Sequence, residues 1–205
     1  KHPSFEGKIN RDSIQLQMKY GYVPEPYSIY KNIFKVMPGQ LLEFITPEKY
    51  SSSFYWKLAV NNSSNHKKSF QENADEFETL FLSSVEEQMV ADVSLGAFLS
   101  GGLDSSAVVA FARELNPDIR CFTIKTEGGQ DKGFIDDLPY ATKVAKHLNV
   151  SLEVVTVDSK KMAEDLQSMV IQLDEPLADP ASLNVLYISK LAKDQGIKVL
   201  LSGTG

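Results

Sequence analysis

The sequence has few of the residues that cross-links, metal sites and membrane spans require. It contains one cysteine, Cys121, so no disulfide can form within the chain, and we interpret this residue as a small core side chain. The three histidines are scattered and show no metal-ligand spacing. No apolar stretch approaches the roughly 20 residues of a membrane-spanning helix. We therefore expect no disulfide framework, no membrane partner and, by default, a cytoplasmic location.

An excess of basic charge is also absent. The chain has 21 Lys and Arg against 27 Asp and Glu, which gives a net charge of −6. Nucleic-acid-binding proteins present basic surface that displaces counterions from phosphates. We therefore expect no nucleic-acid partner. At 205 residues the chain is long enough to bury a core without disulfides or a structural metal.

A polar stretch at 61–68, NNSSNHKK, contains no apolar residue and is predicted to be a linker. Before it, the pattern predicts a helix at 11–19, capped by Asn10, and two strands at 40–45 and 53–58, separated by Pro47. These elements are too few to fold as an independent domain.

After the linker, helical and strand patterns alternate with short joints. Helices are predicted at 69–90, 105–115, 138–148, from a cap at Asp158 to about 173, and at 181–194. Strands are predicted at 94–99, 119–124, 152–157 and 198–201. This alternation predicts an α/β fold, a parallel sheet flanked by helices on both faces. Right-handed crossovers would place the carboxyl ends of all strands along one edge, where ligands bind.

The segment 95–106, LGAFLSGGLDSS, leads from a buried strand through two glycines into a helix. Gly101 and Gly102 let the backbone turn sharply and approach a ligand closely. The first turn of the following helix has unpaired N–H donors and a partial positive charge. Three hydroxyl groups surround the turn, those of Ser100, Ser105 and Ser106. The arrangement predicts an anion cradle, and a di- or triphosphate is its natural occupant.

Two familiar phosphate loops do not fit this segment. The G-x-x-x-x-G-K-[ST] loop needs a lysine, and none lies between Asp92 and Arg113. The G-x-G-x-x-G fingerprint fails because the glycines are adjacent. A carboxylate among phosphates is repulsive unless a cation lies between them, so we predict that Asp104 binds Mg²⁺. The alternative role is an N-cap of the helix, and both roles can hold at once.

The string SGGLDSS at 100–106 resembles the pyrophosphate-binding loop of the ATP pyrophosphatases, which have an adenine nucleotide alpha hydrolase-like fold. Three further segments are similar to the synthetase domain of the asparagine synthetase family: 121–124, 137–145, and 202–205, which resembles the start of Ser-Gly-x-Gly-x-Asp-Glu. The chain ends two residues before that Asp, the family's second magnesium ligand. The resemblance implies a set of nucleotide-binding residues, namely Phe98, Leu99, Ser100, Gly101, Gly102, Leu103, Asp104, Ser105, Ser106, Ile124, Ser202 and Gly203.

The segment before the linker is similar to the end of the family's N-terminal glutaminase domain, through 11–12, 22–24, 29–30 and 36–40. The resemblance implies that residues 1–60 are the C-terminal part of a glutaminase (class II amidotransferase) domain, a small α+β remnant. Residues 69–205 are then the truncated N-terminal part of the synthetase domain. The glutaminase's cysteine nucleophile would lie ahead of this chain, and Cys121 is not it.

The resemblance implies a ligase that uses ATP and Mg²⁺. A carboxylate, aspartate in the parent family, is activated as an acyl-AMP with pyrophosphate release, and glutamine-derived ammonia then forms the amide. Two positions depart from the family: Thr204 replaces a common Glu, and Pro180 replaces an Arg. The segment 174–180 resembles a subgroup that includes amidotransferases of cell-surface polysaccharide pathways. Alternatively, Asp174, Glu175 and Asp179 form a solvated loop with helix caps.

Three other functions stay open at this point. They are an amidotransferase acting on a sugar acid, a ring-closing ligase of the β-lactam synthetase kind, and a non-catalytic nucleotide-binding relative. The oligomeric state, including a homodimer, is also open.

Overall fold

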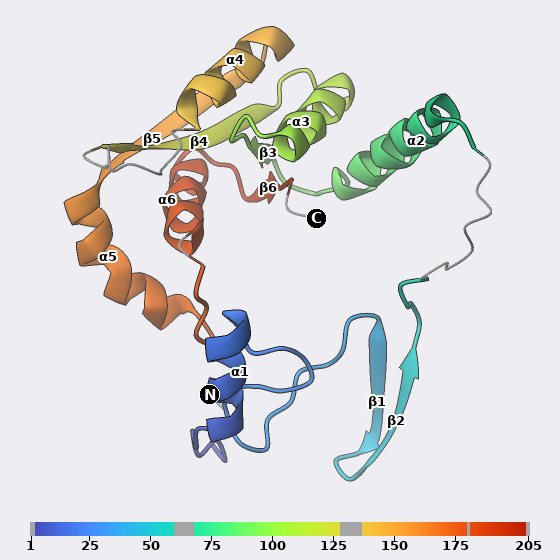
Figure 1. The fold of residues 1–205 in the computed structure, drawn as a ribbon, viewed down its shortest axis with the longest axis vertical. Coiled ribbons are helices and arrows are strands. Elements are labelled where there is room, and N and C mark those ends of the chain that lie inside the picture. The colour runs from blue at the N-terminus through green and yellow to red at the C-terminus, as the bar shows by residue number, and fades with distance from the viewer. Residues whose placement is uncertain (1–2, 60–67, 128–136, 180, 204–205) are drawn as a thin grey trace. The chain divides into compact units, whose positions relative to one another are not determined.

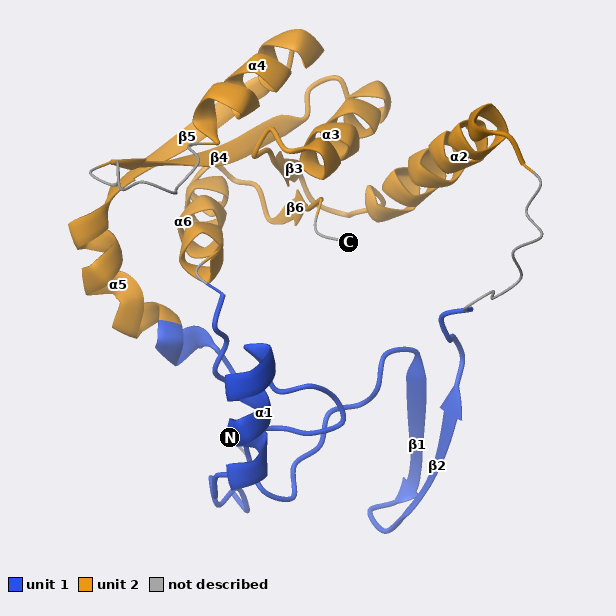
Figure 2. Cartoon of the chain, in the orientation of Figure 1, with its two compact units in different colours: residues 1–66, 170–179 blue, residues 67–169, 180–205 orange. Residues whose placement is uncertain are grey.

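The structure, a computed structural model, describes residues 3–59, 68–127, 137–179 and 181–203 (Figure 1). The chain divides into two compact units (Figure 2). The N-terminal unit comprises Lys1–His66 together with Val170–Asp179, and the sheet unit comprises Lys67–Met169 together with Pro180–Gly205. All but the last residue of the linker expected at 61–68 lie outside the described residues.

The sheet unit contains four parallel strands in the order β5-β4-β3-β6. Their bounds are β3 Leu95–Phe98, β4 Arg120–Glu127, β5 Ser151–Asp158 and β6 Val199–Leu201. Ala97 of β3 lies opposite Cys121 of β4 on one side and Leu201 of β6 on the other. The predicted parallel sheet is confirmed, and β3 occupies an interior position in it.

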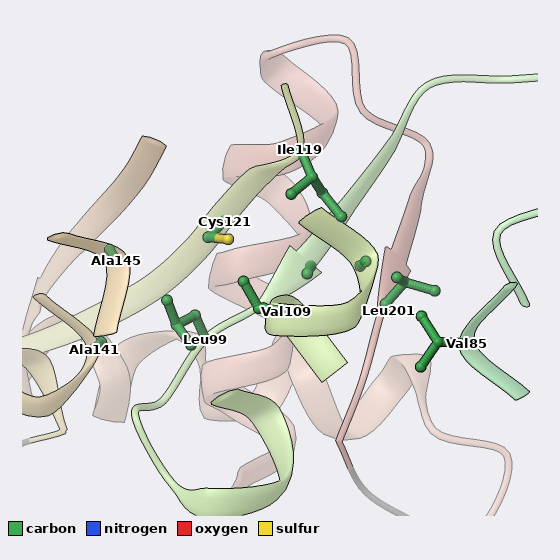
Figure 3. Packing of buried hydrophobic residues seen from close by; sticks show 10 residues of the cluster. Val85, Leu99, Val109, Ile119, Cys121, Ala141, Ala145 and Leu201 are labelled. Atoms are coloured by element: carbon green, nitrogen blue, oxygen red, sulfur yellow. The ribbon is translucent and has the colours of Figure 1, made fainter. Parts of the chain in front are cut away.

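Helices cover both faces of this sheet, as predicted (Figure 1). The helices α2 (Phe70–Gln88), α3 (Leu103–Leu115) and α4 (Leu138–Leu148) pack on one face, and α6 (Ala181–Asp194) packs on the other. Successive strand residues point to opposite faces. Cys121 therefore joins the α2–α3–α4 cluster (Figure 3), whereas Phe122 joins the α6 cluster.

Local signals in the sequence explain where the helices begin. At the start of α2, Ser69 and Glu72 form a reciprocal capping box. Asp158 accepts a 2.7 Å hydrogen bond from the N–H of Lys161, so the predicted cap of α5 (Ser159–Gln172) is confirmed. None of the helices in the described part of the chain is both long enough and apolar enough to cross a membrane.

The N-terminal unit contains α1 (Arg11–Tyr20) and a two-stranded antiparallel hairpin, β1 (Gln40–Thr46) and β2 (Lys49–Phe54). Asn10 caps α1, as predicted, by accepting from the N–H of Asp12. The second strand, expected at 53–58, starts four residues earlier and ends at Phe54. The tight turn between Thr46 and Lys49 sets the register, and pairing stops where β1 begins at Gln40. The aromatic residues after Phe54 favoured a later strand, but β1 offers them no partner.

Candidate functional site

The predicted anion cradle lies where β3 leaves the sheet. The N–H of Leu99 still pairs with the carbonyl oxygen of Phe122 at 2.9 Å, and the chain then turns at Gly101, whose φ is +79°. Helix α3 begins at Leu103, two residues earlier than predicted, with Gly102 as its N-cap. Gly102 supplies no side chain to the first turn, so the N–H groups there stay available to a ligand.

Asp104 is not the N-cap of this helix, so that alternative is wrong. The side chain of an N-cap residue folds back onto the N–H groups of the next turn, and the residue itself lies outside the helix. Asp104 is already helical, in the first turn of α3, and its side chain is exposed. The carboxylate therefore stands at the positive end of the helix without being used to cap it.

The three serines of the loop have different surroundings. Ser100 Oγ lies 3.0 Å from Ser105 Oγ and accepts from the N–H of Gly102 at 3.3 Å. Ser105 Oγ also donates to the carbonyl oxygen of Gly102 at 3.2 Å. These two hydroxyls brace the turn. Ser106 Oγ is buried and has no hydrogen-bond partner, which leaves one polar atom of the loop unsatisfied.

The glycine turn packs closely against the first turn of α4. A Cβ atom at Gly101 would lie 2.4 Å from both the nitrogen of Ala141 and the carbonyl carbon of Tyr140. Only a residue without a side chain fits there. This contact between α4 and the loop could not be predicted from the sequence, because it joins segments about 40 residues apart and no local sequence pattern indicates it.

The end of β6 reaches the same place. A Cβ atom at Gly203 would lie 2.5 Å from the nitrogen of Ser105 and 2.8 Å from the carbonyl carbon of Asp104. The structure therefore brings the Ser202–Gly203 segment against the first turn of α3, although about 100 residues separate them. Thr204 and Gly205 lie outside the described residues.

Four apolar residues predicted to contact the nucleotide have different locations. Phe98 and Ile124 are half-buried on the face that α6 covers. The side chain of Leu99 belongs to the core on the opposite face and is 1% exposed, so only its backbone can reach a ligand at the sheet edge. Leu103 opens α3 and is exposed.

The described residues contain no group of three or more His, Cys, Asp or Glu side chains that could hold a metal ion. A Mg²⁺ site needs less protein than that, since this ion is commonly bound by one or two carboxylates together with substrate phosphates and water. An exposed carboxylate at Asp104, beside unpaired N–H donors, fits such a site. Cys121 is a core residue, as predicted, and burial raises the pKa of its thiol to about 12.

The solvated-loop interpretation of 174–179 is wrong for one residue. Asp174 and Asp179 are exposed, but the side chain of Glu175 is only 17% exposed and pairs with Lys35. The N-terminal unit also holds a cavity of about 960 Å³, lined in part by Tyr30, Lys35 and Glu175, and no residue of the loop 100–106 lines it.

The fold defines a class: a parallel α/β domain in which a glycine turn leads from an interior strand into a helix at the carboxyl edge of the sheet. The chain belongs to the asparagine synthase family, whose sequence model matches residues 76–205.

Curated relatives agree with that membership. The chain is 32% identical, over 96% of its length, to a putative asparagine synthetase [glutamine-hydrolyzing] 2 of Methanocaldococcus jannaschii, and covers 37% of that protein. It is 29% identical, over 97% of its length, to asparagine synthetase [glutamine-hydrolyzing] 1 of Bacillus subtilis, and covers 30% of it. The chain thus spans about a third of these relatives. Among solved structures, the U34-tRNA thiolase NcsA of Methanococcus maripaludis aligns with a TM-score of 0.45 and 14% identity. The alignment covers 71% of this chain and 55% of the thiolase.

Proposed function

We propose that the protein is an ATP-dependent amide ligase of the asparagine synthetase type and that this chain carries its pyrophosphate-binding loop. The acceptor carboxylate, aspartate in our proposal, is activated as an acyl-AMP and then amidated by ammonia from glutamine. One observation carries the proposal: Gly203, at the end of β6, touches the first turn of α3 directly behind the glycine turn. The segment 202–203 and the loop 100–106, about 100 residues apart in the sequence, therefore lie side by side, as a shared phosphate site requires.

In this proposal the first-turn N–H groups of α3 bind the two phosphates that leave together. Ser100 and Ser105 hold the turn in shape through their mutual contact. Phe98 and Ile124 offer apolar surface to the adenine ring. The chain contributes position and charge rather than covalent chemistry, which suits transfer at phosphorus.

The reaction consists of two displacements. A carboxylate oxygen of the acceptor attacks the α-phosphorus, and the bond to pyrophosphate breaks with its electron pair going to pyrophosphate. Ammonia then attacks the acyl carbon, loses a proton and expels AMP. Asp104 would hold Mg²⁺, which when bound neutralises charge on the departing phosphates.

The proposal also assigns the parts of the chain. Residues 1–60 belong to the glutaminase that supplies ammonia, and residues 69–205 belong to the synthetase domain. The protein works with ATP, glutamine and the acceptor as substrates and with Mg²⁺ as cofactor.

The test is exchange of labelled pyrophosphate into ATP by the full-length protein. Asp104→Asn should reduce this exchange at least about 100-fold, because removing one preorganised electrostatic contact in a phosphoryl-type site has effects of that size. Asp118→Asn is the matched control, since Asp118 is an exposed aspartate in the turn before β4, and it should exchange like wild type. Wild-type exchange in Asp104→Asn would exclude the magnesium role.

The same assay identifies the acceptor. Exchange that depends on aspartate supports the asparagine synthetase reaction, whereas exchange that depends on a uronic acid supports a sugar-acid amidotransferase. A ring-closing ligase would exchange with neither. A protein that binds ATP but exchanges with no carboxylate would be a non-catalytic relative.

A further inference from the structure

The first turn of α4 lies directly against the glycine turn of the loop 100–106. A Cβ atom placed on Gly101 would lie 2.4 Å from the carbonyl carbon of Tyr140 and 2.5 Å from its Cβ atom. The next residue, Ala141, is fully buried in the core, whereas Tyr140 is 57% exposed. Tyr140 therefore touches the turn through its backbone and the base of its side chain, while the side chain itself stays open to solvent.

The direction of the Tyr140 side chain follows from the direction of its helix. Helix α4 connects β4 to β5, which are neighbouring parallel strands, so it runs antiparallel to them and begins at the carboxyl edge of the sheet. Side chains on a helix lean toward its N-terminus. The phenol of Tyr140 therefore leans toward the carboxyl edge, where α3 also begins and where ligands bind in such sheets.

The phenol adds a kind of donor that the loop lacks. Its hydroxyl can donate a hydrogen bond, and within the described part of the chain Tyr140 makes none. The loop has no lysine, because none lies between Asp92 and Arg113. Two adjacent phosphates carry more acceptor sites than the unpaired N–H groups of one helix start can fill. A phosphate pair on the first turn of α3 thus leaves oxygens free for a donor on the α4 side of the turn.

We propose that Tyr140 is a further nucleotide-binding residue, whose hydroxyl donates to an oxygen of the β- or γ-phosphate. The first turn of α3 binds the phosphates from one side of Gly101, and Tyr140 binds them from the other. This proposal rests on the proposed function, because it takes ATP to be the ligand of the loop 100–106. Every residue in it belongs to the sheet unit.

The test measures the dissociation constants of ATP and AMP by isothermal titration calorimetry, with the full-length protein and Mg²⁺. Tyr140→Phe removes the hydroxyl and keeps the ring and the packing against Gly101. The Kd for ATP should rise about tenfold or more, the effect of losing one hydrogen bond to a charged group. The Kd for AMP should stay within about twofold, because AMP has neither the β- nor the γ-phosphate.

Thr142→Val is the matched control. It removes a hydroxyl from an exposed residue of the same helix, but a step of two residues turns by about 200°, so Thr142 lies on the opposite flank of α4. Both constants should stay at their wild-type values in this variant. Wild-type affinity for ATP in Tyr140→Phe, or an equal loss for ATP and AMP, would overturn the inference. A wild-type protein that binds no ATP would instead contradict the proposed function, which is a different result.

Discussion

At the scale of single residues, two separate constraints require glycine at position 101: a left-handed backbone and the lack of space for a side chain. Its φ of +79° is unfavourable for any other residue, and a Cβ atom there would overlap the backbone of α4. Gly196 has nearly the same φ, +80°, but nothing lies within 4 Å of a Cβ placed on it. Comparing the two positions isolates the cost of the overlap.

We predict that Gly196→Ala lowers the free energy of unfolding by about 1 kcal/mol, the cost of the left-handed backbone alone. Gly101→Ala should lower it by roughly 3 kcal/mol or more, because α4 must also move away from the loop. Urea unfolding measures both. Equal losses for the two variants would mean that the loop is not packed against α4 as described.

The strand-to-helix turn at 100–106 could be predicted from the sequence because its residues are contiguous. Residues 100–106 combine glycine, hydroxyl and carboxylate groups, and in the structure they form the junction between β3 and α3, as predicted. The roles within the loop could not be predicted. Whether a serine braces the turn, as Ser105 does, or remains unpaired, as Ser106 does, depends on hydrogen-bond geometry that spacing does not encode.

At the scale of elements, the helices and parallel strands of the sheet unit could be predicted within about two residues at most ends. Their apolar periods are clear, and caps such as Ser69 and Asp158 mark where helices begin. Strand β2 was placed wrongly because a strand in a hairpin extends only as far as its partner does. Intrinsic preference favoured the aromatic residues 54–56, whereas pairing with β1 ends the strand at Phe54.

Amide hydrogen exchange should distinguish the two kinds of strand. Strands β3 and β4 are interior and contain fully buried residues such as Ala97 and Cys121. The hairpin β1–β2 has only two strands, and its large apolar side chains, including Phe44 and Tyr50, are exposed. Isolated two-stranded hairpins are marginally stable.

In this chain we therefore expect the amides of β1 and β2 to exchange at rates near those of an unfolded peptide, while those of β3 and β4 exchange only on global or near-global unfolding. Mass spectrometry of peptides from 40–54 and 95–127 measures this. Slow exchange in the hairpin, equal to that of the sheet, would contradict the expectation.

At the scale of the whole molecule, the chain passes between its two units more than once. Residues 170–179 leave the sheet unit, join the N-terminal unit and return at the start of α6. The sequence predicted a single boundary between the two parts of the chain, at the polar stretch 61–68. Composition can indicate a linker, but it cannot indicate an ion pair between residues far apart in the sequence. The pairing of Glu175 with Lys35 is such a long-range contact, and no spacing rule connects residues 140 positions apart.

The central claim is that the turn 100–106 holds the pyrophosphate half of ATP. A crystal structure of the full-length protein with Mg²⁺ and α,β-methylene ATP, which cannot be cleaved at the relevant bond, tests it directly. The account predicts the β- and γ-phosphates within hydrogen-bond distance of the N–H groups in the first turn of α3, at 103–105, with adenine against Phe98 and Ile124. A nucleotide bound elsewhere, with the turn 100–106 free of phosphate, would contradict it.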